Sequence, residues 1–470
     1  MKINSAILPL SLAILGVARR EQVQSHHHHH HRASDLEGSV GPAQITCTVP
    51  QIGAEQDSTP NIMAAFNKCK KNGKIILNGD YLLKTLIYTP RLKNVEIELT
   101  GTINYWDNID AWSKPTRKTH GSGSYELYFQ NATTFFYLQG ENIYLHGNSS
   151  AKVGKGSTIN GNGQVWWEKF AADKKAGSPR ASETFDFARP VLLTIGEAKN
   201  VKIEHINFLN GPFWNLFIMG SKNVTATNIE VVAVSNSSAL PYNSDGVSIY
   251  QSTYVTVLDW DVNNSDDCCT LKGNSFNIEV GRMRCNGSHA VSIGSLGQYK
   301  GVTDIVKNVW IHDITISFAS AGSRIKSWPD NIDSETDAGG GMGLVNNVTF
   351  ENILNIAVDQ PIVITSCYAH DAEYCAAHPS KVEISDVHFI NVTGTASGKH
   401  KDVVATLDCS SECTDITATR TDLTTPTSKK PVFICHNVKS EDKVSFSSVW
   451  VFPIKKCAHD HSFIFSTSAA

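Results

Sequence analysis

The sequence has few charged residues, no basic run and no long hydrophobic stretch beyond its first residues. Charged side chains make up 18% of its 470 residues and the net charge is −4, so the composition does not favour a nucleic-acid partner. After the N-terminal segment, no stretch approaches the roughly eighteen uninterrupted apolar residues that suggest a membrane span. No two cysteines have the spacing of a zinc ribbon, and we expect no metal and no cofactor. With 41% hydrophobic residues, the chain can bury a large core, and we expect a soluble monomer.

The N-terminal residues have the pattern of an export signal. Lys2 precedes the apolar stretch from Ala6 to Val17, so residues 1–18 are expected to be a secretory signal peptide. His26 to His31 form a purification tag, which together with its linker accounts for residues 19–40 and leaves 41–470 as one domain. Glycosylation sequons support a secreted, extracellular protein and begin at Asn131, Asn148, Asn223, Asn236, Asn263, Asn286, Asn347 and Asn391.

Eleven cysteines in an exported chain indicate disulfides, and the odd number leaves at least one thiol unpaired. Close spacing favours the pairs Cys47–Cys69, Cys367–Cys375, Cys409–Cys413 and Cys435–Cys457. Cys268 and Cys269 are adjacent, so only one of them is expected to pair with Cys285.

A short pattern recurs along the chain: an asparagine, a β-branched residue, and then alternating apolar and polar residues. Copies begin at Asn94, Asn142, Asn200, Asn223, Tyr254, Asn277, Asn308, Asn347 and Lys381. Alternation predicts strands, and a repeat of about 20 to 40 residues predicts a solenoid. Hairpin signals are sparse and the leucine-rich repeat signature is absent. We therefore expect an all-β, single-domain parallel β-helix.

One stretch, starting at Asn61 with the sequence NIMAAFNKCKKNGK, has the pattern of an amphipathic helix. Such a helix would cover the open N-terminal end of the solenoid, where unpaired strand edges are a liability.

Chemically capable residues recur at the coil period. Asp245 is followed 21 and 22 residues later by Asp266 and Asp267, and His289 lies 22 residues beyond Asp267. Arg324, Lys326 and Tyr368 come later in the chain. Because coils of a solenoid stack about 4.8 Å apart, these residues are expected to share one face. Each alone is more often a turn, loop or strand residue; their common period favours a functional cluster.

Three clustered carboxylates could bind Ca²⁺ or share acid–base work on a glycosidic bond. Crowded carboxylates repel, so at least one should keep its proton near neutral pH and act as a general acid. Arg324 and Lys326 indicate an anionic substrate, because arginine binds carboxylates well. The residues predict a glycosidase for an acidic polysaccharide.

The motifs NSDG (243–246), DDC (266–268), GSHAVSIGS (287–295) and RIK (324–326), in this order, resemble those of glycoside hydrolase family 28, the polygalacturonases. The resemblance also includes GNGQVWW (161–167), GPFWNL (211–216) and Tyr368, and it covers nearly the whole mature chain. CNGSHAVSIGSLGQY and RIKSWP are most similar to fungal exo-acting members. The family implies a right-handed β-helix and a hydrolysis that inverts the anomeric configuration.

The resemblance also implies a role for each site residue. Asp266 would be the general acid, with His289 helping to maintain its proton, while Asp245 and Asp267 would hold and deprotonate the attacking water. Arg324 and Lys326 would bind galacturonate carboxylates, Tyr368 would shape the neighbouring subsite, and Asn243 would bind sugar or order Asp245. An inverting mechanism needs roughly 6.5 to 9.5 Å between acid and base. Cys268–Cys285 becomes the favoured disulfide and Cys269 a buried free thiol.

The sequence departs from the family at Ala290, where a glycine is common, and the methyl group could narrow the site or shift His289. Two long segments, 107–128 and 329–343, could close one end of the cleft and make the enzyme exo-acting. One or two of Trp106, Trp112, Trp166, Trp167 and Trp328 could stack on sugars.

The predicted function is exo-hydrolysis of polygalacturonan (pectin), releasing galacturonic acid from non-reducing ends. The alternatives are exo-action on rhamnogalacturonan or xylogalacturonan, a calcium-dependent pectate lyase of the same fold, and a carbohydrate-binding solenoid without activity.

Overall fold

The protein is described by a computed structural model that covers residues 41–176, 188–331, 338–427 and 429–439. The expected signal peptide (1–18) and the tag with its linker (19–40) lie outside the described residues. So do the C-terminal residues 440–470, including Cys457.

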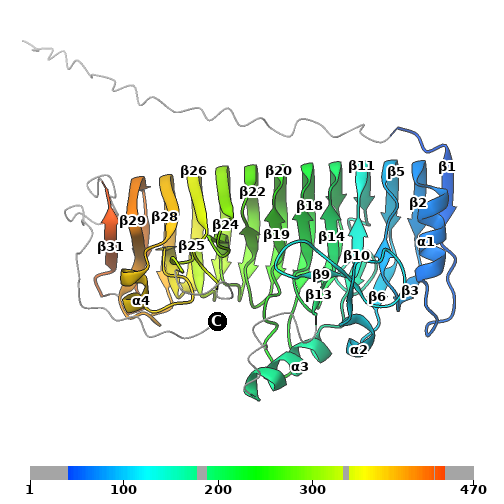
Figure 1. Ribbon diagram of the computed structural model, residues 1–470, viewed down its shortest axis with the longest axis horizontal. Helices are drawn as coiled ribbons and strands as arrows, with labels where there is room; N and C mark the ends of the chain where they lie inside the picture. The colour runs from blue at the N-terminus through cyan, green and yellow to red at the C-terminus, as the bar shows by residue number, and fades with distance from the viewer. Residues whose placement is uncertain (1–40, 177–187, 332–337, 428, 440–470) are drawn as a thin grey trace, which may run out of the picture.

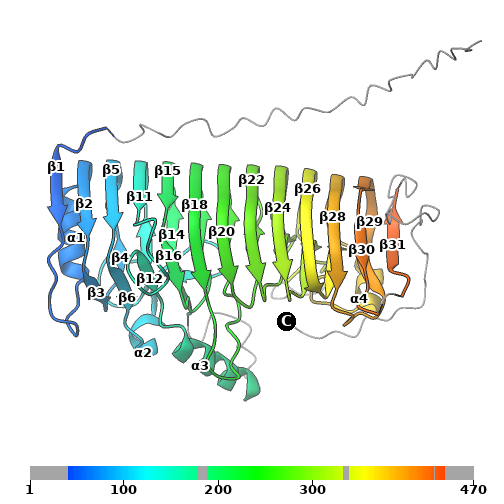
Figure 2. The ribbon, with the colours of Figure 1, turned by 180° about the vertical axis from the view of Figure 1, so that it is seen from behind.

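The described chain winds into a long solenoid of parallel strands, as Figures 1 and 2 show. The strands lie in three stacks, called here stacks A, B and C, and every described pairing between neighbouring coils in these stacks is parallel. Stack A consists of β1 (Ile45–Thr48), β2 (Lys71–Leu77), β5 (Leu92–Leu99), β11 (Gly140–His146), β15 (Lys199–Glu204), β18 (Lys222–Val232), β20 (Thr253–Asn263), β22 (Ser275–Asn286), β24 (Thr303–Ser317), β26 (Met342–Val358) and β28 (Lys381–Ala396). Stack B consists of β4 (Ile87–Tyr88), β10 (Phe136–Leu138), β14 (Leu193–Gly196), β17 (Leu216–Met219), β19 (Val247–Tyr250), β21 (Cys269–Leu271), β23 (Val291–Leu296), β25 (Ala321–Ser327), β27 (Gln360–Thr365), β29 (Val403–Thr419) and β31 (Val432–Val438). Stack C consists of β3 (Asp80–Leu83), β6 (Thr102–Tyr105), β12 (Thr158–Asn160) and β16 (Asn207–Leu209), which pairs with the second half of β18; β30 (Asp422–Thr424) pairs with the end of β28. The predicted parallel β-helix is confirmed.

The recurring asparagine occupies the same position in successive coils, although Tyr254 takes its place in one coil. Asn94, Asn142, Asn200 and Asn223 have φ values of 55° to 58°, a left-handed conformation that asparagine tolerates better than most residues. Their side-chain amides are hydrogen-bonded from coil to coil, with Asn142 Nδ2 donating to Asn94 Oδ1 at 2.7 Å and Asn223 Nδ2 to Asn200 Oδ1 at 2.9 Å. This asparagine ladder explains why the repeat begins with that residue.

The expected start of the last copy at Lys381 is wrong. Val348 pairs with Val387, so the residue that corresponds to Asn347 is Asp386, which also has a left-handed φ of 57°. The strand β28 is long and alternates on both sides of this position, which made its register ambiguous from sequence alone.

The predicted N-terminal helix is present as α1 (Thr59–Lys68), which buries Ile62, Ala65 and Phe66 against the first coil. It ends earlier than expected, because Asn72 takes a left-handed φ of 49° and the sequence KNGK opens β2. The described residues contain three further helices that were not predicted: α2 (Ile109–Trp112), α3 (Gln164–Lys175) and α4 (Ala372–Ala377). No helix in the described part of the chain is long and apolar enough to cross a membrane.

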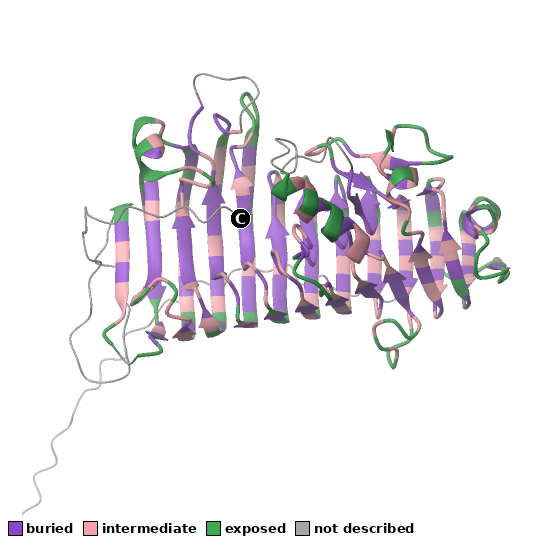
Figure 3. Ribbon diagram, turned by 90° about the horizontal axis from the view of Figure 1, so that it is seen from below, coloured by how far each residue is buried: buried purple, intermediate pink, exposed green. Residues whose placement is uncertain are grey.

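The core lies between the stacks, where inward-facing side chains repeat from coil to coil, and Figure 3 shows the strands as mostly buried. One such column runs through Leu216, Val247, Cys269 and Val291, all buried. Cys269 is therefore a buried free thiol in the core, as expected.

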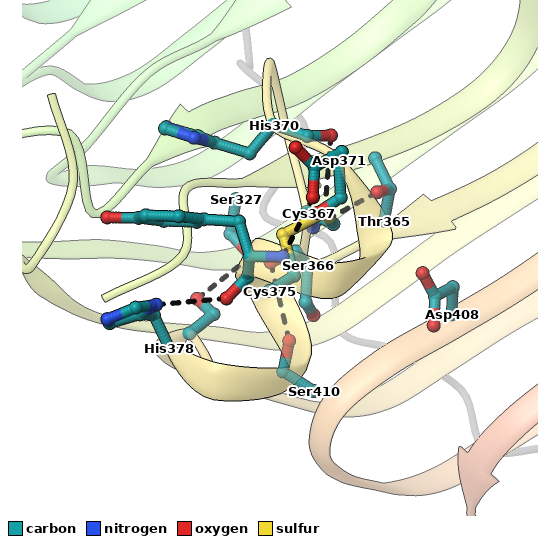
Figure 4. Close-up of a disulfide and its surroundings, with 12 residues drawn as sticks. Ser327, Thr365, Ser366, Cys367, His370, Asp371, Cys375, His378, Asp408 and Ser410 are labelled. Carbon is teal, nitrogen blue, oxygen red and sulfur yellow. Dashed lines mark hydrogen bonds between the residues drawn. A yellow bond between two sulfur atoms is a disulfide. The ribbon is translucent and has the colours of Figure 1, made fainter. Parts of the chain in front are cut away.

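Within the described residues, four disulfides join Cys47–Cys69, Cys268–Cys285, Cys367–Cys375 and Cys409–Cys413, all as expected. The expected partner of Cys435, Cys457, lies outside the described residues. Figure 4 shows the Cys367–Cys375 bridge, which closes a loop that contains Tyr368 and the first turn of α4. In this loop the Asp371 carboxylate caps α4 by accepting a hydrogen bond from the Tyr374 backbone at 2.8 Å.

Of the tryptophans considered for sugar stacking, Trp112, Trp166 and Trp167 are almost completely buried. Trp166 and Trp167 come from α3 and pack into the main core. Only Trp106 and Trp328 retain intermediate exposure.

Candidate active site

The candidate site lies on the outer face of stack B, where turns lead into β19, β21 and β23. The register pairs Val247 with Cys269 and Cys269 with Val291, so the residues two positions earlier, Asp245, Asp267 and His289, lie on successive coils. One carboxylate oxygen each from Asp245, Asp266 and Asp267 lies within 4.8 Å of the others. The coil period therefore predicted this cluster correctly.

Asp267 is held in its charged form by two cations. Arg324 Nη2 lies 2.5 Å from Asp267 Oδ1, and Lys326 Nζ lies 2.8 Å from Oδ2. Burial acts to raise the pKa of Asp267, but the two cations outweigh it and lower the pKa to about 2. In the free site, Arg324 and Lys326 thus contact Asp267, whereas the sequence predicted them as ligands of the substrate.

Asp245 is the carboxyl group that favours its protonated form. Burial, followed by the charge of Asp266, raises the pKa of Asp245 to about 7. The Thr270 hydroxyl lies 2.9 Å from Asp245 Oδ2 and 3.1 Å from Asp267 Oδ2, and it has one proton to donate. Asp267 is ionised, so it can accept the single hydroxyl proton of Thr270. A proton on Asp245 then provides the hydrogen for the contact between Asp245 Oδ2 and the Thr270 oxygen.

Asp266 forms an ion pair with His289, with 3.4 Å between Oδ1 and Nδ1. Burial opposes the charged forms of both groups, but the imidazolium lowers the pKa of Asp266 and the carboxylate raises the pKa of His289. The sequence predicted that His289 helps Asp266 to keep its proton. In the structure the two pKa shifts instead favour an ionised Asp266 and a proton on the His289 imidazole. Backbone amides of Asn243 and Asp267 also donate to Asp266, at 3.0 and 2.8 Å.

The separation of the carboxylates is smaller than expected. Inverting glycosidases commonly leave roughly 6.5 to 9.5 Å between acid and base. The turns before the strands do not move the carboxylates further apart than one coil spacing, because one oxygen from each of the three lies within 4.8 Å of the others. The water would have to lie beside the cluster, within reach of Asp245 and Asp267 together.

Asn243 is positioned by a residue that the sequence did not single out. Its φ of 57° turns the chain, and its side-chain oxygen accepts a hydrogen bond of 2.7 Å from Arg189 Nη2. Arg189 is only 4% exposed and its guanidinium lies 4.1 Å from the ring centre of Phe170 in α3. No local motif marks Arg189, since its role depends on the fold bringing two segments together.

Tyr368 and Ala290 lie on the side of the site that faces the C-terminal coils. The ring of Tyr368 has its centre 5.1 Å from Lys326 Nζ and packs edge-on against Trp328. Ala290 is fully buried and packs with Ala321 and Val363, so its methyl group fills a small apolar cluster.

Sequence reasoning also missed a column of hydroxyl groups. Ser248, Thr270 and Ser292 pair with one another across successive coils and donate hydrogen bonds to Asp245 or Asp267. Each follows Asp245, Asp267 or His289 by three residues. That fixed offset was a signal in the sequence that could have identified them.

The outer face of stack B is covered on the N-terminal side of the site. Segment 124–135 contributes β8 (Ser124–Glu126) and β9 (Thr133–Thr134), which form a small sheet with β7 (Pro115–Thr116) and β13 (Pro190–Val191). Between β8 and β9, Phe129 stacks on Tyr250 with ring centres 3.9 Å apart and also contacts Trp214 and Phe217. We call this cluster of Phe129, Trp214, Phe217 and Tyr250 the aromatic plug. Gln130 Nε2 extends the closure by donating a 2.6 Å hydrogen bond to Gln298 Oε1 after β23.

Comparison with known proteins identifies the family to which the chain belongs. The model of "Glycosyl hydrolases family 28" matches residues 79–446. The chain is 36% identical over 405 residues to the probable exopolygalacturonase X of Aspergillus fumigatus, covering 84% of this chain and 87% of that protein. It is 34% identical over 416 residues to the exopolygalacturonase of Cochliobolus carbonum, covering 87% of this chain and 86% of that protein.

Two solved structures are also similar to this chain over most of its length. The endo-xylogalacturonan hydrolase of Aspergillus tubingensis has a TM-score of 0.73 and 28% identity, covering 86% of this chain and 99% of that chain. The polygalacturonase of Erwinia carotovora ssp. carotovora shares the fold, with a TM-score of 0.61 and 20% identity over 85% of this chain and 97% of that chain. With a family model and full-length relatives both matching most of its length, the chain belongs to glycosyl hydrolase family 28.

Proposed function

We propose that this protein is a secreted exo-polygalacturonase, which hydrolyses polygalacturonan from its non-reducing ends and releases galacturonic acid. The observation that carries the proposal is the aromatic plug beside the carboxylate cluster. A groove that is closed next to the cleaving groups accepts the end of a polymer and excludes its middle. The names of the fungal relatives support exo-action, and the disulfides and sequons support secretion.

In the proposed reaction, Asp266 transfers to the glycosidic oxygen the proton that it shares with His289. The bond between the anomeric carbon and this oxygen breaks, while a water held by Asp245 and Asp267 attacks the carbon and loses a proton to a carboxylate. Asp267 stays ionised over a wider pH range than Asp245, because Arg324 and Lys326 neutralise its charge. Asn243 orders the turn before Asp245, and Tyr368 lines the subsite beyond Lys326.

Arg324 and Lys326 are proposed to bind a galacturonate carboxylate as well as Asp267. Lys326 has three ammonium hydrogens and, among the described residues, contacts one carboxylate oxygen, Asp267 Oδ2, so it can bind a second anion as well. The same pairing argues against Ca²⁺ chemistry, because both oxygens of Asp267 are engaged by cations. Activity that is insensitive to a chelator, without an unsaturated product, is expected.

The test is a time course with polygalacturonate. We expect galacturonic acid to be the first and main product, and we expect proton NMR to show that its anomeric configuration is inverted. Mixed oligomers at early times would refute exo-action. A retained configuration would refute the water-holding role of Asp245 and Asp267 without affecting the exo assignment.

A second candidate, hydrolysis of xylogalacturonan, is supported by the likeness to the Aspergillus tubingensis enzyme. Xylogalacturonan carries side groups on the same polysaccharide backbone. The two candidate functions therefore differ in the space that the site must leave for these side groups. Parallel rates on xylogalacturonan and on polygalacturonate distinguish them, and we expect the unsubstituted polymer to be the better substrate.

A further inference from the structure

Lys272, directly after β21, lies on the outer face of stack B between the carboxylate cluster and the aromatic plug. The register pairs Ile249 with Leu271 and Leu271 with Ile293, which places Lys272 between Tyr250 on the preceding coil and Gly294 on the next. Gly294 pairs in turn with Lys326. Two lysines therefore lie two coils apart along the groove, with a glycine between them.

The ammonium group of Lys272 has no hydrogen-bond or ion-pair partner among the residues that the structure describes. The residue is only 8% exposed, and its Nζ lies 4.5 Å from the ring centre of Trp214 and 5.9 Å from that of Phe129. The other cations around the site differ from Lys272, since Arg189, Arg324 and Lys326 each donate hydrogen bonds to oxygen atoms. A buried charge without an anion is costly and is rarely retained without a purpose.

The nearby carboxylates do not supply this missing anion. Asp267 is engaged by Arg324 and Lys326, and Asp266 by His289. Asp245 is within electrostatic range of Lys272 but makes its contacts with Ser248 and Thr270. Burial lowers the pKa of Lys272, although the charge of Asp245 partly opposes this. An incoming anion would both satisfy the ammonium group and strengthen its charge.

On the next coil, the position beside Lys272 is occupied by the buried glycine Gly294. Gly294 has a φ of 109°, and a side chain there would meet the backbone oxygen of Lys326 at 2.1 Å, so this position has to remain a glycine. This column thus carries a lysine on either side of a glycine, with the ring of Trp214 beside Lys272.

We propose that Lys272 binds the carboxylate of the terminal, non-reducing galacturonate at the closed end of the groove. Lys272 then holds the sugar on one side of the cleaved bond, while Arg324 and Lys326 hold the sugar on the other. This proposal rests on the proposed exo-polygalacturonase function, because it assigns the sugar that is released to the closed side. It makes Lys272 a specificity residue that recognises an acidic chain end.

The test compares trigalacturonate with the same trisaccharide methyl-esterified at its non-reducing-end carboxyl group. Because a hydrogen bond to a charged group is lost, the wild-type kcat/KM should fall about 10- to 100-fold on the ester. In Lys272→Met, kcat/KM on trigalacturonate should fall by a similar factor, and the ester should be cleaved no worse than the acid. A Lys272→Met enzyme that still prefers the acid by the wild-type factor would overturn the proposal.

Two controls separate binding from folding and from the function itself. Lys272→Met should keep or raise the Tm, since methionine replaces an unpaired buried charge; a fall in Tm with equal loss on both substrates would assign Lys272 a structural role and overturn the proposal. Lys222→Met removes an exposed lysine that lies over the ring of Tyr254, and it should leave both rates unchanged. If the wild type does not release galacturonic acid at all, the proposed function fails. If the wild type releases galacturonic acid but Lys272→Met still prefers trigalacturonate over its ester, the proposed function stands and this inference fails.

Discussion

The outer face of stack B has two regions that share one backbone and differ in chemistry. Phe217, Ser248, Thr270 and Arg324 occupy the same column on different coils, so one position changes from aromatic to hydroxyl to cation along the groove. On the N-terminal side the column is covered by Phe129 and forms part of the aromatic plug. On the other side it contacts the carboxylates. The coils thus supply equivalent positions on the outer face of stack B. The side chain at each position determines whether it packs in the aromatic plug or contacts the carboxylates.

The largest expected effect is on the catalytic region. In Asp266→Asn, the group that donates the proton is lost, and kcat should fall by about 100- to 10,000-fold. The affinity for oligogalacturonate, measured by calorimetry, should remain within a few-fold of the wild type, which also separates an enzyme from a binding solenoid. Asp261→Asn is the matched control, because Asp261 is a surface partner of Arg284. Substantial activity in Asp266→Asn would remove Asp266 from the mechanism.

Opening the plug should change the products more than the rate. In Phe129→Ala, the ring that covers Tyr250 is removed, and longer oligomers should rise at least several-fold relative to galacturonic acid at early times. The products are measured by anion-exchange chromatography. Phe318→Ala removes an aromatic ring that is 70% exposed and should not alter the products. An unchanged product pattern in a folded Phe129→Ala enzyme would show that the plug is not what closes the groove.

The catalytic region should also be the pH-sensitive one. The pKa of Asp245 is raised to about 7 by burial, so its contribution to stability is complete below the ordinary aspartate pKa of about 3.9 and is lost as the pH rises through 7. The free energy of unfolding should therefore fall between about pH 4 and pH 8, and Asp245→Asn should reduce this fall. Urea denaturation over that range measures it. Equal slopes in the two proteins would show that Asp245 does not hold the proton.

The smallest effect is expected at Ala290. Its methyl group packs with Ala321 and Val363, so Ala290→Gly should lower the free energy of unfolding by about 1 kcal/mol. The kcat/KM on polygalacturonate and on xylogalacturonan should change less than about threefold. A larger change in the ratio of these rates would show that Ala290 affects substrate choice directly.

The sequence was sufficient to predict the solenoid and most of the site, because both depend on the coil period. Asp245, Asp267 and His289 are spaced by 22 residues, and the structure aligns them on neighbouring coils. The same reasoning did not find α3, whose few apolar residues pack against the core without a clear helical pattern over the whole segment.

Other features could not be predicted because they arise from contacts between distant segments. Arg189 reaches Asn243 across 54 positions in the sequence, and Gln130 reaches Gln298 across 168. The protonation of the cluster likewise depends on distances. Arg324 and Lys326 were predicted near the carboxylates, but only the geometry shows that both contact Asp267 and leave the raised pKa to Asp245.

The asparagine ladder bears on how such an enzyme can diversify. Coils that carry the asparagine are aligned with their neighbours at this ladder position, whereas the number of residues between ladder positions is free to vary, as between Asn142, Asn200 and Asn223. An inserted loop therefore lengthens one coil without shifting the next, and the carboxylates keep their alignment. Segment 124–135, which carries the plug, lies in one of these variable intervals, between Asn94 and Asn142. Substrate preference can thus evolve by insertion and deletion while the reaction chemistry is inherited unchanged.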